Sequence, residues 1–442
     1  MMLKKWGSLF LVGLLVMSML AACSGKDKAS SDNSKSGSEK KEVTLKFVHW
    51  INEDVGQWEK VIAKYEAEHP GIKVESIPLV ENMSSLDYFK QLDLMASAGD
   101  DMDVIMFSNV NDLSKRVDAG LVEPITKFTE AEGIDINKEY NNSYPTFNGD
   151  YYGLPMKNVT MLIMLNKAHL DKAGLKIPTD WTWEDYAEYA KKLTADGHYG
   201  SYLHTWHNFH SILKVMSKAK DNSILKEDGT SNADDPMVRA SLELRNQLEN
   251  VDKSSVPFEE ILSQKMDYRQ QFFSQNASMV PTGSYMITEW GQFTPEFEIA
   301  WAPWPKNKAN DEAVAVMGGD LVSIAKSSKH KQEAYDFMRW LTTEGISEQG
   351  IWVPSWKKAD MSAALEKVAN GAKKPDAINM ESLKTTLSSV KPSEVVAPPA
   401  YTNEAYTEFG AEVELYLLGE QDLDKTMKNI KEKVQAVVDA NK

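Results

Sequence analysis

The feature that most constrains the fold of this chain is an alternation of strand and helix signals between residues 43 and 122. Apolar residues recur with period two, or run together, in three short segments, 43–50, 72–77 and 103–107. Each segment is followed by apolar residues at helical spacing, and the first helical stripe stops at His69-Pro70-Gly71. A βαβαβα order predicts a parallel sheet that is covered by helices on both faces.

Residues that directly follow a strand are the first candidates for a ligand site, because ligands of such sheets bind beyond the carboxyl ends of the strands. His49 and Trp50 end the first predicted strand, and Asn52 and Glu53 follow it. Ser108 and Asn109 follow the third strand. The sequence therefore predicts that these two groups of residues lie at the edge of the sheet where the parallel strands end.

The remainder of the chain is richer in helix. Two further strands are expected at 298–301 and 321–325, and we find no internal repeat. Amphipathic helices are expected at 183–192, 236–248, 335–341 and 411–418. Thr182, with Asp185 three residues later, predicts the N-terminal cap of the first of these helices.

The N-terminus is typical of an export signal. Lys4 and Lys5 precede an apolar run at 9–20, and small residues then lead to Cys23, the only cysteine of the chain. Residues 20–23, LAAC, resemble the bacterial lipobox, in which the cysteine is acylated and becomes the new N-terminus. A membrane-spanning helix is the alternative, but the apolar run is short for a bilayer of about 30 Å.

Residues 24–41 are polar and small, which predicts a flexible tether. The formal net charge of the whole chain is −16. From Glu42 onward the chain holds 42 basic and 62 acidic residues, a net charge of −20. Such a surface repels phosphate backbones, so the composition argues against a nucleic-acid partner.

Nine segments stand in an order and at a spacing that carry a family resemblance. They are 61–74 (VIAKYEAEHPGIKV), 96–105 (ASAGDDMDVI), 152–155 (YGLP), 165–167 (LNK), 173–175 (AGL), 182–183 (TW), 273–285 (FSQNASMVPTGSY), 324–331 (IAKSSKHK) and 337–341 (FMRWL). Together they resemble the extracellular solute-binding proteins of ABC sugar importers, the maltose-binding-like family. The sequence departs from the family pattern at Met102, Asn276 and Tyr285, where the family usually has Pro, Gly and Trp.

The resemblance implies an α/β fold with two lobes, three hinge crossings and a ligand cleft between the lobes. The crossings are expected near Lys157-Asn158, Trp301-Ala302 and Leu341-Glu344. The implied division of the chain is a signal peptide at 1–22, a lipidated Cys23 with its tether at 23–41, a first lobe at 42–157 plus 302–342, and a second lobe at 158–301 plus 343–442.

The function that the resemblance implies is capture of a mono- or oligosaccharide by hinge closure and its delivery to the permease. It also implies a monomer without cofactor or enzymatic activity, anchored by its lipid to the outer face of the cell membrane. Receptors for a peptide or a polyol remain alternatives within the same class. A surface-anchored glycan hydrolase is the alternative from another class, since carboxylate pairs are abundant in this sequence.

A sugar offers an apolar ring face and a rim of hydroxyls, so its site needs aromatic platforms beside Asp, Asn or Glu. Tyr285 is a candidate because it stands at the position of a stacking aromatic in the family. The stretch 318–320 looks like the glycine-rich segment of the family, where the backbone approaches the ligand. The full candidate set is Trp50, Asn52, Glu53, Ser108, Asn109, Asn158, Trp206, Tyr285, Gly318, Gly319, Asp320 and Trp356.

Two other groups of residues have some features of metal sites. His204, His207 and His210 recur every three residues, a spacing that could hold zinc on a helix, but no carboxylate or cysteine completes the set. The alternating acidic and polar residues at 228–234 lack the turn glycine and the closing glutamate of a calcium loop. No metal is therefore expected, and the motifs of common hydrolases and nucleotide-binding proteins are absent from the sequence.

Overall fold

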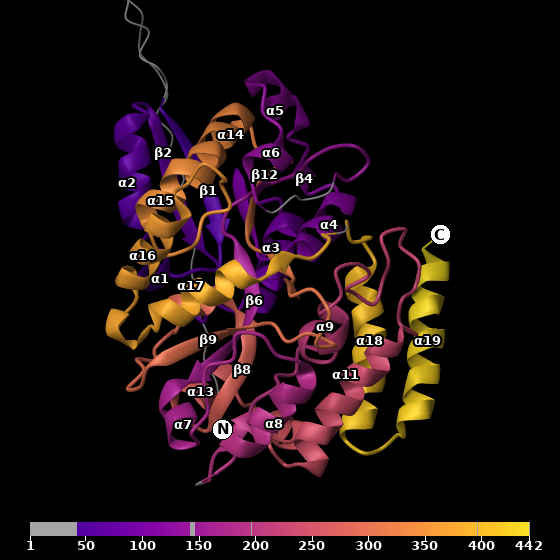
Figure 1. Cartoon of the computed structure of the whole chain (residues 1–442). Coiled ribbons are helices and arrows are strands. Elements are labelled where there is room, and N and C mark those ends of the chain that lie inside the picture. Colours follow the sequence, from indigo (N-terminus) through magenta and orange to yellow (C-terminus); the bar gives the residue numbers. More distant parts are fainter. Residues whose placement is uncertain (1–41, 142–145, 196, 396, 442) are drawn as a thin grey trace, which may run out of the picture. The chain divides into compact units, whose positions relative to one another are not determined.

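The structure, a computed structural model, describes residues 42–141, 146–195, 197–395 and 397–441 (Figure 1). One compact unit begins at Glu42, and the described helices and strands all belong to it. The predicted signal peptide, Cys23 and the tether lie outside the described residues.

The alternating segments at the start of this unit form a mixed six-stranded sheet in the order β2-β1-β3-β12-β4, with β5 also paired to β12. As predicted, β1 runs parallel to both β2 and β3, whereas β12 runs antiparallel to β3, β4 and β5. The strands of this first sheet are β1 (Val43–His49), β2 (Ile72–Pro78), β3 (Val104–Phe107), β4 (Val122–Glu123), β5 (Leu154–Pro155) and β12 (Leu321–Ala325).

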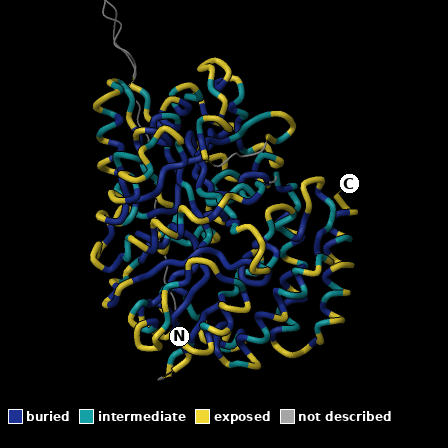
Figure 2. The backbone as a smooth tube through the Cα atoms, viewed as in Figure 1, coloured by how far each residue is buried: buried dark blue, intermediate teal, exposed yellow. Residues whose placement is uncertain are grey.

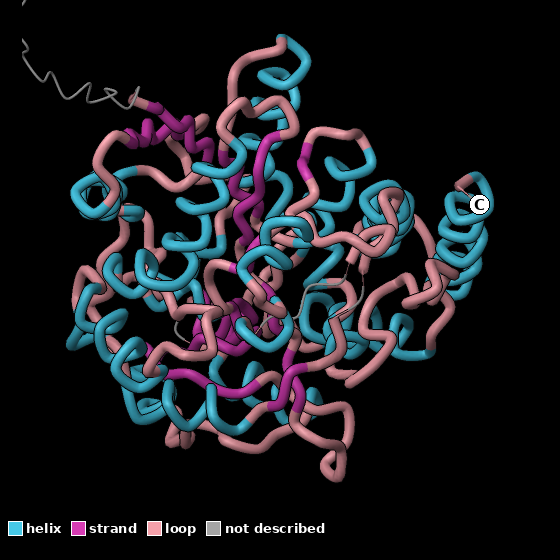
Figure 3. The backbone as a smooth tube through the Cα atoms, turned by 90° about the horizontal axis from the view of Figure 1, so that it is seen from above, coloured by secondary structure: helices cyan, strands magenta, loops and turns pink. Residues whose placement is uncertain are grey.

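Helices cover this sheet and bury an apolar core with it, so that the central strands β3 and β12 are dark blue and the outer faces of the helices are yellow in Figure 2. The helices that pack here are α1 (Glu53–Gly56), α2 (Trp58–Glu68), α3 (Ser85–Ala98), α4 (Val110–Asp118), α5 (Thr126–Glu132), α6 (Ile136–Glu139), α14 (Lys331–Trp340), the π-helix η3 (Leu341–Gly345) and α15 (Ile346–Gln349). Figure 3 shows helices on either side of the strands, as a βαβ order requires.

A second sheet has the order β11-β6-β8-β7, with β9 also paired to β6. Its central strand faces two cores, because Ile163 and Leu165 point to one side and Leu162 and Met164 to the other. Its strands are β6 (Val159–Asn166), β7 (Tyr199–Ser201), β8 (Ala277–Gly283), β9 (Ile299–Pro303) and β11 (Met317–Gly318), and β10 (Val314–Ala315) pairs separately with β13 (Lys391–Pro392).

The remaining helices pack around this second sheet. They are α7 (Lys167–Lys172), α8 (Trp183–Leu193), α9 (His207–His210), α10 (Leu213–Met216), α11 (Pro236–Asn246), η1 (Gln247–Val251), α12 (Phe258–Gln264), α13 (Tyr268–Phe273), η2 (Ser284–Ile287), α16 (Met361–Gly371), η4 (Pro375–Ala377), α17 (Met380–Ser389), α18 (Thr402–Leu417) and α19 (Leu423–Ala440). Thr182 caps α8 as predicted, and its side chain exchanges hydrogen bonds with Asp185 in a capping box. No helix in the described part of the chain combines the length and the apolar character needed to cross a membrane.

The chain passes from the first sheet to the second between β5 and β6, at the position expected from Lys157-Asn158. The other two passages lie later than expected. Trp301 and Ala302 are inside β9 and pair with β6, and the chain returns to the first sheet only between β11 and β12. The segment after Leu341 still packs on the first core as far as Trp352. Apolar periodicity reports that a segment is buried, but not which of two apolar cores buries it.

Candidate functional site

The ends of the strands in both sheets lie beside the three chain segments that join the two lobes. β1 and β3 end at this edge, and β12 begins there because it runs antiparallel to β3. In the second sheet β6 begins at this edge, whereas β7, β8 and β11 end there. The residues predicted from strand ends therefore lie where a ligand could touch both lobes.

The three joining segments run side by side. The amide of Met156 donates to the carbonyl of Asp320 at 2.8 Å, and the amide of Ser355 donates to the carbonyl of Met156 at 3.0 Å. The amide of Asn158 donates to the carbonyl of Val353 at 2.8 Å. We call the segments 156–158, 318–320 and 353–355 the crossings.

A group of buried charges ties the crossings together. The Lys157 ammonium lies 2.8 Å from an Asp320 carboxylate oxygen and 2.7 Å from Glu289, and each of the three side chains is at most 8% exposed. Glu289 also accepts a hydrogen bond from the Trp352 indole at 3.0 Å. Because Trp352 stands beside the third crossing, one lysine connects all three segments.

The carboxylates of Asp320 and Glu289 thus share the one buried ammonium of Lys157. This arrangement shifts the pKa values of Asp320 and Lys157. Burial raises the pKa of Asp320 to about 7; Lys157 opposes the shift and Glu289 adds to it. Burial alone would lower the pKa of Lys157, but Asp320 and Glu289 raise it above its ordinary value. Lys157 is therefore charged at neutral pH, while Asp320 titrates near neutrality.

Gly319 fits this arrangement for a steric reason. Its φ of +146° is rare for a residue with a side chain, and a Cβ there would overlap the carbonyl oxygen of Lys157. Gly318 has open space at the corresponding position. The glycine at 319 lets the first two crossings approach each other.

Three of the predicted residues in the first lobe cap helices. Asn52 accepts a hydrogen bond from the Val55 amide and caps α1, and the Glu53 carboxylate accepts hydrogen bonds from amides at the start of α2. Asn109 caps α4. Trp50 is only 4% exposed, and its ring lies 5.3 Å from that of Tyr88. These contacts hold the side chains of the edge in place.

Trp206 is the half-buried aromatic of the second lobe at this edge. It follows β7 by five residues, and its ring lies edge-on to those of His204 and Tyr268, with centroids 4.7 and 5.2 Å apart. The ring of His210 is parallel to it at 6.0 Å. Trp206 is thus held in place by three neighbouring rings while part of it stays accessible.

Tyr285 and Asn158 complete the second lobe's part of the edge. The Tyr285 hydroxyl accepts a hydrogen bond from Thr282 at 3.0 Å, and burial raises its pKa. The side-chain oxygen of Asn158 is buried, with no hydrogen-bond partner among the described residues. Such an acceptor is costly unless water or a ligand donates to it.

Trp356, the last predicted residue, follows the third crossing. It is half-buried against the first core, and its indole donates to Glu139 at 3.3 Å. By their place along the chain, the twelve predicted residues stand in a crossing or within five residues of a strand end or a crossing. Their contact with a ligand stays a prediction.

The family model of the bacterial extracellular solute-binding proteins matches residues 37–348. The chain belongs to this family. The multiple sugar-binding protein of Streptococcus mutans is 29% identical to it over 364 residues, which are 77% of this chain and 79% of that protein.

Solved structures share the fold. A substrate-binding protein of an ABC transporter from Listeria monocytogenes, in complex with cycloalternan, has a TM-score of 0.72 at 20% identity and covers 91% of this chain and 100% of its own. UgpB from Mycobacterium tuberculosis, in complex with glycerophosphocholine, has a TM-score of 0.71 at 18% identity, with 90% and 99% covered. The predicted two-lobed fold is confirmed.

The three histidines of this solute-binding protein have protein partners. His204 pairs with the Tyr202 hydroxyl at 2.9 Å, and His207 pairs with Glu414 at 3.1 Å. His210 lies 3.1 Å from the carbonyl of Pro281. Burial lowers the pKa of His204 and His207 to about 4, so both rings are neutral at pH 7. The described residues contain no cluster of three ligands suited to a metal ion.

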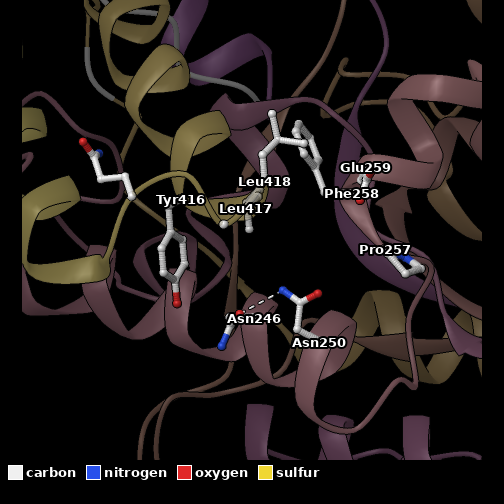
Figure 4. A pocket seen from close by; sticks show the side chains of 10 residues that line it. Asn246, Asn250, Pro257, Phe258, Glu259, Tyr416, Leu417 and Leu418 are labelled. Carbon is white, nitrogen blue, oxygen red and sulfur yellow. Dashed lines mark hydrogen bonds between the residues drawn. The ribbon is translucent and has the colours of Figure 1, made fainter.

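A pocket of about 300 Å³ lies elsewhere on this solute-binding protein (Figure 4). Its lining comes from the end of α11, from η1, from the start of α12 and from the end of α18 with the segment after it, and includes Asn246, Phe258, Tyr416 and Leu418. All of these elements pack around the second sheet, so closure of two lobes would not enclose a ligand there. We therefore assign the candidate site to the crossings.

Sequence reasoning missed the residues that hold the site together. Lys157 is expected from the sequence only as part of a crossing, and Glu289 and Tyr268 are not among the candidate residues. None of them belongs to a motif, and each is brought to the edge from a different element. The only sequence signal for a buried charge here is that Lys157 directly follows three apolar residues, Leu-Pro-Met, at 154–156.

Proposed function

We propose that this solute-binding protein captures a mono- or oligosaccharide between its lobes and delivers it to the permease of an ABC importer. It acts by binding, without chemical change of the ligand. The observation that carries the proposal is the pairing of an aromatic platform with an unsatisfied acceptor at one edge: the half-buried Trp206 ring and the buried Asn158 oxygen. An apolar sugar face would stack on the first, and a hydroxyl would donate to the second.

The names of relatives support the same ligand class. The relative from Streptococcus mutans is a multiple sugar-binding protein, and the Listeria structure holds cycloalternan, whereas UgpB holds glycerophosphocholine. The fold alone therefore does not choose the ligand. The aromatic platform favours a sugar over a peptide or a polyol.

Ligand capture depends on an equilibrium between an open and a closed arrangement of the two lobes. A sugar that contacts Trp206 on one lobe and Ser108 or Asn109 on the other stabilises the closed form by its extra contacts in that form. The three crossings keep the lobes connected as the angle between them changes.

The test is thermal unfolding of the chain from Glu42 onward against a panel of saccharides, polyols and peptides. A ligand present at about 1,000 times its dissociation constant adds about 4 kcal/mol to the native state, which raises the midpoint clearly. A shift with a saccharide class supports the proposal; a shift with peptides or polyols only overturns the sugar assignment. Recovery of the bound saccharide intact after long incubation is expected, and cleavage products would favour the hydrolase.

Trp206→Ala tests the platform directly. We expect saccharide affinity to fall by about two- to tenfold, since an aromatic stack contributes about 0.5–1.5 kcal/mol. Tyr416→Ala removes a half-buried ring from the separate pocket and is the matched control, for which affinity is expected to stay unchanged.

We further propose that Cys23 carries a lipid anchor, with residues 24–41 as tether. Labelled palmitate is expected to enter the full chain in a bacterial host, and Cys23→Ser is expected to abolish both the label and membrane association. Label in the Cys23→Ser chain would contradict the anchor.

A further inference from the structure

The two lobes meet at a place other than the crossings. The Ser114 hydroxyl on α4 donates to the carbonyl oxygen of Pro398 at 2.7 Å, and Ser114 is 3% exposed. Nearby, the Asn403 amide donates to Asp112 at 3.4 Å. We call residues 397–403, which comprise the approach to α18 and the first two residues of that helix, the strap; Figure 1 shows this yellow-orange segment passing beside α4.

The two sides of this contact belong to different cores. α4 is attached to the first core through Leu113, which is 1% exposed. The strap is attached to the second, because the Tyr401 hydroxyl donates to the carbonyl of Gly229 at 2.8 Å and Ala405 is buried in that core. Hydrogen bonds between Ser114 or Asp112 and the strap therefore link the lobes.

Asp112 connects this link to the candidate site. One of its carboxylate oxygens accepts from the Asn109 amide at 2.7 Å and from the Ser108 hydroxyl at 3.5 Å, and the other accepts from Asn403. Burial raises the pKa of Asp112, while Asn109 and Arg116 favour its charged form. Since the carboxylate is one rigid planar group, a change at the strap also moves the oxygen that orients Ser108 and Asn109.

We propose that the strap and α4 form a latch between the lobes, and that Asp112 is a positioning residue which couples this latch to the ligand-facing side chains of Ser108 and Asn109. The latch is a property of the fold itself, and only the ligand-facing role of these two residues rests on the proposed function. When the strap leaves α4, the lobes separate more easily and the two side chains lose their fixed orientation.

The latch can be measured without any ligand. Because Cys23 is the only cysteine, the chain from Glu42 onward has none, and spin labels can be attached through Glu130→Cys on α5 and Lys425→Cys on α19, both exposed positions. Pulsed electron spin resonance then reports the distance between the lobes in frozen solution. The test variants are Ser114→Ala and Asn403→Ala. The control is Thr407→Ala, which loses only a hydrogen bond to the backbone carbonyl of Asn403 inside α18 and leaves the Asn403 side-chain amide in place.

We expect each test variant to shift the ratio of separated to latched molecules about fivefold, the ratio that corresponds to a net hydrogen bond of about 1 kcal/mol. Thr407→Ala is expected to match the parent. Unchanged distances in both test variants would overturn the latch. If Ser114→Ala fails to fold, Asn403→Ala still decides, because Asn403 is exposed.

The positioning role of Asp112 needs a second measurement, with a readout that a mere loss of stability would not change. In the asparagine-labelled protein the side-chain amide resonance of Asn109, assigned by its disappearance in Asn109→Ala, reports the bond to Asp112. Ser114→Ala and Asn403→Ala are expected to shift this resonance, and Thr407→Ala is not. A distance change without a shift of this resonance would overturn the coupling through Asp112. Neither measurement involves a sugar, so failure here is distinct from failure of the proposed function.

Discussion

The charge group at the crossings leads to a quantitative prediction for Asp320→Asn. In the parent, Asp320 and Glu289 compete for the single ammonium of Lys157, and all three side chains are buried. An amide at position 320 removes one of the two competing charges while keeping nearly the same shape. The variant is expected to be more stable than the parent at alkaline pH and nearly equal to it at acidic pH.

The magnitude follows from the pKa of Asp320, which is about 7 in the folded protein against an ordinary value of 3.8. The fold favours the protonated form, so this stabilisation is complete below the ordinary pKa and is lost as the pH rises through about 7. At about 1.4 kcal/mol per pH unit, the difference between the two pKa values corresponds to about 4 kcal/mol. Because Asp320 is only 4% exposed, screening by solvent reduces this free-energy difference only slightly.

The assay is urea unfolding of the parent and of Asp320→Asn at about pH 4, 7 and 8.5, with the free energy of unfolding extrapolated to water. The difference between variant and parent should grow by up to about 4 kcal/mol across this range. Asp376→Asn, which removes the charge of an exposed aspartate, is the matched control and should change the free energy of unfolding by less than about 0.5 kcal/mol. A difference between Asp320→Asn and the parent that stays constant across the three pH values would refute the assignment of a near-neutral titration to Asp320.

Two further variants test the packing of the crossings and of the second lobe. Gly319→Ala should lower the free energy of unfolding by at least about 3 kcal/mol, because residue 319 has a positive φ and the added Cβ would overlap the Lys157 carbonyl. Gly318→Ala is the control and should change the free energy of unfolding by less than about 1 kcal/mol. Equal effects of the two variants in urea unfolding would contradict the steric argument. Glu249→Gln should cost about 3 kcal/mol, because it leaves the fully buried Arg245 guanidinium without its charged partner at 2.7 Å. Glu243→Gln, on the exposed face of the neighbouring helix, is its control, and a loss no larger than that of the control would show that the buried pair contributes little.

Much of the local structure could be predicted from the sequence. The alternation at 43–107 predicts β1, β2 and β3 nearly to the residue, and Thr182 with Asp185 predicts the start of α8. These elements depend on periodicity and on capping within a few residues, and both are visible along the chain. The edge at which Trp50 and Ser108 lie followed from the same periodicity, since parallel strands end together.

The path of the chain between the sheets could not be predicted in the same way. The stretch from Ala302 to Gly318 was expected in the first lobe, but it pairs and packs with the second. Its apolar pattern suits a strand of either sheet, so the local pattern does not distinguish the two outcomes. The choice is made by pairing with residues far away in the sequence, such as Ile163, which is the partner of Ala302.

The sequence by itself determined the strand and helix order, the acidic surface and the residues available at the strand ends. Only the tertiary structure decided that Lys157 meets Glu289 and Asp320, and that Ser114 meets Pro398. These partners are separated by more than a hundred residues of chain. A buried charge or hydroxyl must find a partner to offset its lost hydration, but which partner it finds depends on the packing of the whole chain.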